Sequence, residues 1–215
     1  MNDGAAADLE AKRKGSAAAK FAAAAYAHQS RGQRAAALAA ADKALANSEE
    51  GRIKFLAARI FVEAGEFARA EALAATLSNN LRPEMQAYGK IVAANIAGKK
   101  KDGVGAVKLL TEANGLLDTW IGHFDLGRAY LDMSAFPQAD AEFDRCIKRR
   151  GEALSLLVDE EPTYRYFPPV YYYQGLVREG LKNAASADSF RQYLAIRGNS
   201  TEDPLLPDIR RRVGQ

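Results

Sequence analysis

Cysteine and long apolar runs are what this 215-residue sequence has least of. Its one cysteine, Cys146, excludes an internal disulfide and fits a reducing compartment. No run of about 18 apolar residues without a charge occurs, so we expect no membrane span. The first residues, MNDGAAADLEAKRKG, are polar where a secretory signal would be basic and then apolar. We therefore expect a cytoplasmic protein.

An excess of one charge sign is also missing. Lys and Arg number 30 against 27 Asp and Glu, and a net charge of +3 is too small to indicate nucleic-acid binding. The basic runs 99–101 and 148–150 stand at the ends of predicted helices, where they complement the helix dipole. The acidic run 159–161 follows the second basic run closely. We expect no nucleic-acid partner and no membrane partner.

Residues and motifs typical of catalytic, metal-binding or phosphate-binding sites are few. The two histidines, His28 and His123, lie far apart on predicted helices without converging partners, so neither indicates a metal site or a catalytic triad. Cys146 falls on a small-residue position of a predicted helix, which indicates a buried, inert thiol. The stretch GVGAVK, 103–108, lacks the third glycine and the preceding strand of a phosphate loop. We expect no catalytic residues, no metal and no cofactor, and thus not an enzyme.

What the sequence does contain is a repeat. Its best copy is WIGHFDLGRAYLDMSAFPQADAEFDRCIKRRG, residues 120–151. The spacing predicts a helical hairpin in which Gly127 and Ala139 are small where the two helices cross. Tyr130 and Phe143 would fill the space beside that crossing. Pro137 suits the first turn of the second helix.

The same template finds further copies along the chain. Gly32 and Gly65, at equivalent sites of the first two copies, are separated by 33 residues, close to a repeat period of about 34. The predicted copies span residues 18–50, 51–84, 87–119, 120–151 and 168–201, with an insertion at 152–167.

These spacings resemble the tetratricopeptide repeat (TPR) family, although His123 and Gly151 stand where that family often has tryptophan and proline. The resemblance implies an all-α fold: a right-handed superhelical solenoid of about five hairpins with a C-terminal capping helix. We expect a flexible segment at 1–17, the array at 18–202, and the capping helix and tail at 203–215.

The stretch YFPPVYYYQG, 166–175, places three tyrosines after two prolines. Proline favours a helix start here, and a helix spreads three adjacent side chains over about 200°. The first helix of a stacked hairpin meets the previous repeat, its own partner helix and the open groove. We therefore expect three different environments, with Tyr172 in the groove and its two neighbours in the core.

A second, narrower resemblance covers residues 124–212. The CIKRRGEA junction, the DEEPTYRYFPP loop and the REGL turn are similar to the C-terminal TPR segment of bacterial eukaryote-like serine/threonine protein kinases and related signalling proteins. The chain lacks a kinase glycine-rich loop, HRD and DFG. This resemblance implies a packing or dimerisation segment of a larger signalling protein, with a homodimer as one arrangement.

The TPR resemblance also implies a function: binding of a peptide or partner protein in the concave groove made by the first helices, in a scaffolding or regulatory role. Arg59 and Arg128 occupy the same site two repeats apart, each one turn from an aromatic residue. The alternative is that the aromatics are core between repeats and the arginines are solvated. The predicted groove residues are Tyr26, Phe55, Arg59, Tyr88, Asn95, Phe124, Arg128 and Tyr172.

Overall fold

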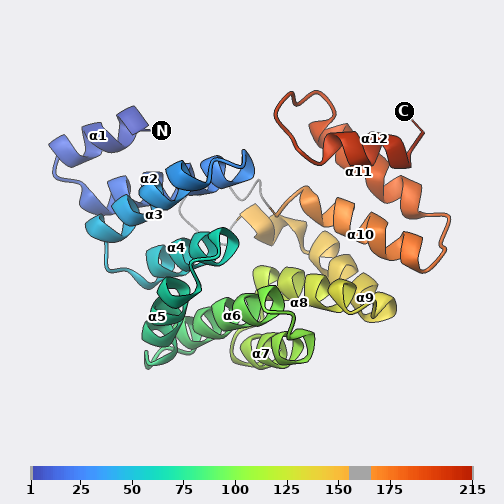
Figure 1. Cartoon of the computed structure of the whole chain (residues 1–215), viewed down its shortest axis with the longest axis horizontal. Coiled ribbons are helices and arrows are strands. Elements are labelled where there is room, and N and C mark those ends of the chain that lie inside the picture. Colours follow the sequence, from blue (N-terminus) through green and yellow to red (C-terminus); the bar gives the residue numbers. More distant parts are fainter. Residues whose placement is uncertain (1, 155–165, 215) are drawn as a thin grey trace. The chain divides into compact units, whose positions relative to one another are not determined.

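The fold is all-α over the residues that the computed structural model describes, 2–154 and 166–214, where no strand is present (Figure 1). The first seven helices are α1 (Asn2–Glu10), α2 (Lys14–Ser30), α3 (Arg34–Asn47), α4 (Gly51–Ala64), α5 (Phe67–Ser78), α6 (Pro83–Lys99) and α7 (Gly103–Leu116). They are followed by α8 (Trp120–Asp132), α9 (Phe136–Lys148), the 3₁₀ helix η1 (Arg150–Leu154), α10 (Pro169–Gly180), α11 (Ser186–Arg197) and α12 (Leu206–Arg212).

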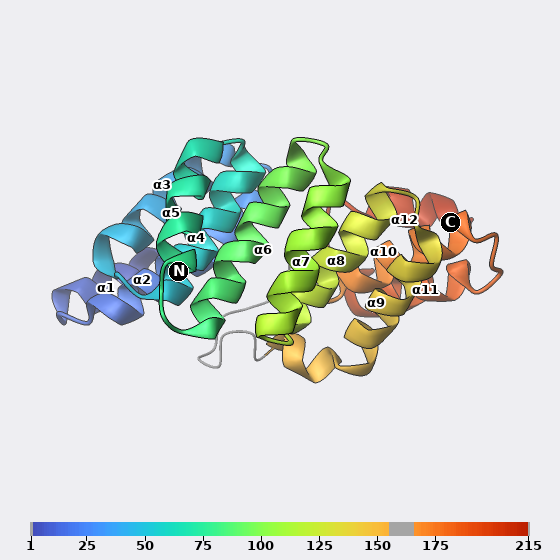
Figure 2. The ribbon, with the colours of Figure 1, turned by 90° about the horizontal axis from the view of Figure 1, so that it is seen from below.

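The chain divides into two compact units, residues 1–117 and 118–215. Within each unit, helices that follow one another in sequence pack together, as α4, α5, α6 and α7 do side by side in Figure 2. One helical hairpin corresponds to each of the five predicted repeat ranges: α2/α3, α4/α5, α6/α7, α8/α9 and α10/α11. Two helices, α2 and α6, begin before their predicted ranges, at Lys14 and Pro83. This consecutive packing is consistent with a helical-repeat fold.

The first helices of successive hairpins also meet. In the first unit α2 packs on α4, and α4 packs on α6. In the second unit α8 contacts α10. No comparable contact joins the second helices α3, α5 and α7, all within the described part of the chain. The first helices are therefore the inner, more crowded layer of the first unit.

Local sequence explains where several helices begin and end. The Asp102 carboxylate accepts a hydrogen bond from the Gly105 amide at 2.8 Å, which caps α7. The Thr119 hydroxyl accepts one from the Gly122 amide at 3.0 Å, which caps α8. Gly65 ends α4 with φ of +79°, a left-handed conformation that glycine adopts without strain.

The core changes in character along the chain. The α2/α3 hairpin is held mainly by alanine, whereas α4 is buried at Ile53 and at every position from Phe55 to Val62. In α8/α9 the Phe143 ring lies directly over Gly127, and in α10/α11 the Phe190 ring lies over Gly175. Gly127 is thus the close crossing point that the repeat spacing predicts, and Gly175 is the equivalent position of the α10/α11 hairpin, where the ring comes one residue earlier than in α8/α9.

The beginning of the chain differs from our expectation of a flexible segment. Residues 2–10 form α1, which packs on α2 with Ala5 fully buried. Asp8 is buried as well, and its carboxylate contacts Arg13 and Lys20, each at 2.6 Å. These ion pairs and the apolar contact hold the segment in place. Most of the predicted insertion, 155–165, lies outside the described residues.

The short helix α12 closes the second unit. Leu206 and Ile209 pack against Phe190 and Tyr193 of α11, and Tyr171 and Tyr172 of α10 border the same cluster. This helix lies within the range 203–215 predicted for a capping helix.

Candidate functional site

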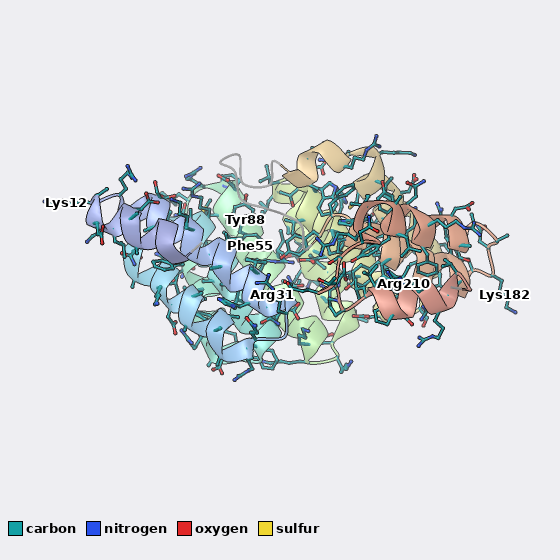
Figure 3. The ribbon with its side chains drawn as sticks, turned by 90° about the horizontal axis from the view of Figure 1, so that it is seen from above. Lys12, Arg31, Phe55, Tyr88, Lys182 and Arg210 are labelled. Atoms are coloured by element: carbon teal, nitrogen blue, oxygen red, sulfur yellow. The ribbon has the colours of Figure 1, made fainter. Side chains whose placement is uncertain are left out.

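Two of the predicted groove residues pack against each other inside the first unit. Phe55 on α4 and Tyr88 on α6 stack with ring centroids 4.4 Å apart, and they lie side by side in Figure 3. Their exposed fractions are 0% and 6%. Burial, together with the Glu84 carboxylate that accepts from the hydroxyl, raises the pKa of Tyr88 to about 12. Both side chains therefore act as core between first helices in this structure.

The polar groove residues of the first unit are only partly accessible. Arg59 is 6% exposed, with its guanidinium carbon 5.6 Å from the Phe55 ring centroid, a cation–π distance. We expected a surface side chain, but Arg59 is buried on α4, a helix that packs on both α2 and α6. Asn95 donates its amide N–H to the Ile91 carbonyl at 2.9 Å and is half-buried. Tyr26 on α2 is also half-buried.

In the second unit Phe124 is likewise core, with 1% of its surface exposed. Its ring stacks on Trp120 at 5.3 Å and meets Phe143 edge-on at 6.0 Å. Arg128 is half-buried and places its guanidinium carbon 5.4 Å from the Tyr173 ring centroid. Three of the aromatic residues predicted to line the groove are therefore buried, as the alternative interpretation of core packing between repeats requires: Phe55, Tyr88 and Phe124.

The three consecutive tyrosines do have three environments. Tyr171 packs on Phe167, and Tyr173 stacks on Phe143. Tyr172 donates its hydroxyl to the Asp208 carboxylate at 3.0 Å and lies near Phe190. Tyr172 was the one expected in the groove, but its hydroxyl is instead bonded to the capping helix α12.

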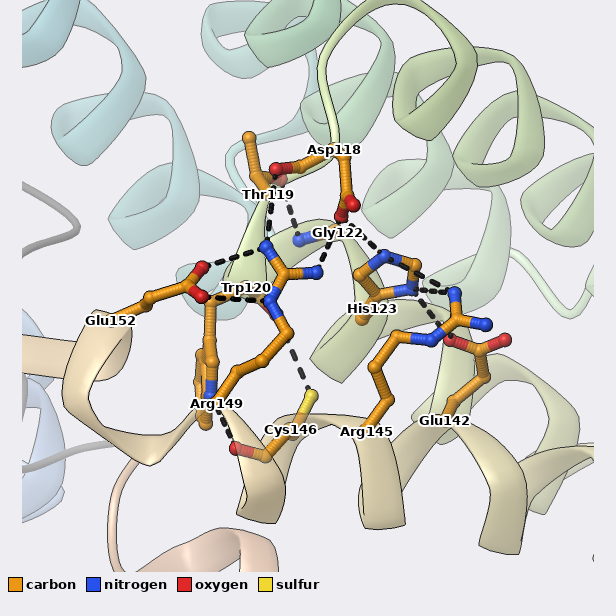
Figure 4. Close-up of polar contacts among 10 residues, drawn as sticks. All are labelled: Asp118, Thr119, Trp120, Gly122, His123, Glu142, Arg145, Cys146, Arg149 and Glu152. Atoms are coloured by element: carbon orange, nitrogen blue, oxygen red, sulfur yellow. Dashed lines mark hydrogen bonds and ion pairs between the residues drawn. The ribbon is translucent and has the colours of Figure 1, made fainter.

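A cluster of charged side chains lies where α8, α9 and η1 meet, and Figure 4 shows it in close-up. The His123 side chain is 5% exposed. Its Nε2 atom lies 2.7 Å from the Asp118 carboxylate, and its Nδ1 atom lies 2.6 Å from the Glu142 carboxylate. We call the group of six residues the His123 cluster: Asp118, His123, Glu142, Arg145, Arg149 and Glu152.

Arg149 connects the cluster to the segment that precedes α8. Its guanidinium donates to Asp118 at 2.6 Å and to the two carboxylate oxygens of Glu152 at 2.8 and 2.7 Å. Hydrogen bonding from Arg149, with a smaller contribution from His123, holds the pKa of Asp118 below its usual range. Arg149 lowers the pKa of Glu152 in the same way. All three groups are charged at neutral pH.

The sequence reasoning missed this cluster, because it assigned His123 no converging partners. Glu142 lies on α9 and Asp118 precedes α8, and no local spacing in the sequence pairs either of them with His123. The other histidine, His28 on α2, has its Nδ1 atom 2.6 Å from the side-chain oxygen of Gln33, the N-cap residue of α3.

Cys146 is buried, as predicted. Its thiol contacts the Trp120 carbonyl at 3.7 Å, and the Trp120 indole N–H donates to the Cys146 carbonyl at 2.8 Å. Burial raises the pKa of the Cys146 thiol well above its usual range, an effect that disfavours the nucleophilic thiolate.

Other kinds of site were sought in residues 2–154 and 166–214. There, no group of three or more His, Cys, Asp or Glu side chains is arranged to hold a metal ion. No helix in the same ranges combines the length and the apolar character that crossing a membrane requires.

The TPR assignment stays a resemblance, carried by the spacing of Gly127, Ala139 and Phe143 and by the succession of helical hairpins. A comparison with models of protein families and a search of curated proteins both found no match for this chain.

Proposed function

We propose that this chain is a non-catalytic, TPR-like interaction module that binds a partner protein or peptide on the face made by its first helices. The observation that carries the proposal is the succession of contacts from α2 to α4 and from α4 to α6, which the second helices lack. Hairpins that converge on one side form a curved stack, and extended concave surfaces of this kind serve in binding.

The partner-binding residues proposed here are fewer than those predicted from the sequence. Three of the predicted residues are buried and pack beneath this face instead of lining it: Phe55, Tyr88 and Phe124. Tyr26 and Asn95 in the first unit and Arg128 in the second retain exposed surface on first helices. Tyrosine and arginine are the side chains that contribute most to binding energy in protein interfaces, and asparagine can bond a peptide backbone.

The contacts that the charged side chains make also favour a binding module over an enzyme. Ion pairs join successive hairpins: Lys99 of α6 contacts Glu63 of α4 at 2.8 Å, and Arg34 of α3 contacts Glu66 at 2.6 Å. In these pairs charge serves to connect helices. The same holds in the His123 cluster, where both ring nitrogens of the histidine face carboxylates.

Photo-crosslinking tests the proposal. A benzophenone amino acid placed at Tyr26 or Asn95 is expected to capture the same partner from a lysate of the source organism. Matched probes at Ala39 on α3 and Thr111 on α7, which are exposed on second helices, should not capture it. Equal capture from both sets of positions would place the binding surface elsewhere.

The partner identified by mass spectrometry is then titrated against purified protein by calorimetry. The Tyr26→Ala variant should bind at least about tenfold more weakly than the wild type, equivalent to about 1.4 kcal/mol. Unchanged affinity for Tyr26→Ala and for Asn95→Ala would overturn the proposal. Thermal melts of each variant separate lost contacts from lost folding.

A further inference from the structure

The lysines and arginines of the first unit are concentrated on its first helices. Within their bounds α2, α4 and α6 hold seven Lys and Arg against two Glu, a net charge of +5. The second helices α3, α5 and α7 hold four Lys and Arg against three Asp and Glu, a net charge of +1. The cations of the first helices are Lys14, Lys20, Arg52, Lys54, Arg59, Lys90 and Lys99.

First helices are not basic throughout the chain. In the second unit α8 and α10 together hold two Arg against three Asp and Glu, a net charge of −1. The positive excess therefore belongs to one layer of the first unit. This is the layer whose helices pack on one another and form the binding face proposed above.

Some of these cations are accessible. The side chains of Lys99 and Arg52 are 40% and 28% exposed. Lys99 of α6 contacts Glu63 of α4 at 2.8 Å, so this pair lies where two first helices meet. Arg59 is buried on α4, and salt screens a buried charge less than an exposed one. The positive charge thus combines accessible groups with one group that solvent screens weakly.

Carboxylates from other elements pair with several of the first-helix cations. The side chains of Glu49 and Glu50, which precede α4, are 87% and 53% exposed, so their ion pairs are largely hydrated. Exposed ion pairs of this kind contribute little to stability, and a carboxylate from a partner can replace them at little cost. The four pairs are Lys20 with Asp8, Arg52 with Glu50, Lys54 with Glu49, and Lys90 with Glu112.

We propose that this face of the first unit binds an acidic segment of a polypeptide partner, a conclusion that rests on the function proposed above. Complementary charge speeds encounter and discriminates against basic partners. Single-stranded nucleic acid is also anionic, but proteins that bind it present aromatic rings on which the bases stack. Phe55 and Tyr88 are buried and stack on each other, so a polypeptide fits this face better.

Fluorescence anisotropy with defined probes tests the charge preference. The probes are three labelled peptides of equal length and apolar content, rich in Glu, Gln or Lys, and a single-stranded RNA oligonucleotide. The full chain should bind the Glu probe at least about tenfold more tightly than the Gln probe at low salt, and the difference should shrink as salt is added. Equal binding of the Glu and Gln probes, or tighter binding of the RNA, would overturn the acidic-segment proposal.

Two double variants with the same net charge locate the surface. Arg52→Gln with Lys99→Gln should weaken binding of the Glu probe at least about fivefold. The control, Lys43→Gln with Lys108→Gln, removes exposed cations from α3 and α7 and should change it less than about twofold. Equal losses in both variants would mean that only net charge matters and would refute the face. If the first variant does not fold in thermal melts, the probe comparison on the wild type still decides the charge preference.

Failure of the charge preference is distinguishable from failure of the binding face. Mass spectrometry locates the segment of the partner that is crosslinked at Tyr26 or Asn95, and this segment should carry net negative charge. A neutral or basic segment would overturn the acidic-segment proposal and leave the binding face intact. Preference for the Glu probe without capture of any partner at these positions would instead count against the binding face.

Discussion

At the scale of single residues, glycines at the helix crossings determine how closely the hairpins pack. A Cβ atom built on Gly127 would lie 2.7 Å from the Phe143 ring, below any normal contact distance, and Gly175 is closer still to Phe190. Both rings are fully buried and cannot move aside without disturbing their neighbours. The absence of a side chain at these two positions is therefore a packing requirement.

The Gly127→Ala variant should be destabilised by about 1–3 kcal/mol, because the added methyl group overpacks the crossing. Gly115→Ala is the control. It is also a helical glycine, but nothing lies within 4 Å of its added Cβ, so the change should be neutral or stabilising by up to about 1 kcal/mol. Urea unfolding followed by circular dichroism measures both. Equal destabilisation would mean that the crossing is not tightly packed.

The candidate site was less predictable than these packing positions. Small residues at fixed spacing reveal a helix crossing, because only they allow it. The position of a residue within the repeat does not predict whether it is exposed in a groove or buried, because that depends on how closely the neighbouring first helices approach. The stacking of Phe55 on Tyr88 between α4 and α6 therefore could not be predicted from the sequence. The partners of His123 come from two other segments, so only the pairing of α8 with α9 brings them together.

At the scale of elements, the short helix α12 packs against α10 and α11. It contributes two buried apolar side chains, and Asp208 adds a bond from Tyr172 and an ion pair with Arg212 at 2.7 Å. Hydrogen bonding from Arg212, and less from Tyr172, lowers the pKa of Asp208. A carboxylate with a lowered pKa stabilises the folded form above about pH 4 and loses that effect as the pH falls further.

The Asp208→Asn variant should therefore loosen α12. Trypsin should cut after Arg210 and Arg211 several times faster than in the wild type at pH 8. The control Asp188→Asn, at an exposed residue that pairs with Arg191, should leave the cleavage rate unchanged. Mass spectrometry of the fragments gives both rates. Equal rates in Asp208→Asn and the wild type would show that the apolar contacts alone hold the helix.

The five helical hairpins were predicted from the sequence, whereas the helix that precedes them was not. Five hairpins follow from the recurrence of Gly, Ala and aromatic residues at repeat spacing, and the structure has a helix pair in each range. Helix α1 was missed because its alanine-rich, polar sequence has little apolar periodicity. Its anchor, the pairing of Asp8 with Lys20, depends on a contact with the following helix.

At the scale of the whole molecule, the core is distributed unevenly. Nearly all the buried residues of α2 and α3 are alanines, whereas α4 buries two phenylalanines, two isoleucines and a leucine. Apolar burial contributes roughly 25 cal/mol per Å², so hairpins built on alanine gain less from packing than those built on larger side chains.

Hydrogen exchange measured by mass spectrometry should therefore show a gradient within the first unit. Backbone amides of α2 and α3 are expected to exchange at least about tenfold faster than those of α4, because partial opening begins where least apolar surface is buried. The gradient should survive in Gly127→Ala, whose change lies in the other unit. Stronger protection in α2 and α3 than in α4 would show that close alanine packing compensates for its smaller area.

The single tryptophan provides an optical probe of one hairpin. Trp120 is the only indole in the chain, its ring is buried, and its N–H is fixed to the Cys146 carbonyl. Tyrosine does not absorb at the long-wavelength edge of the protein's ultraviolet band, so fluorescence excited there comes from Trp120 in the α8/α9 pair alone. Its emission should shift to longer wavelength only when that pair opens to water. The natural sequence thus contains a label for the second unit, and stopped-flow kinetics of that unit need no added dye.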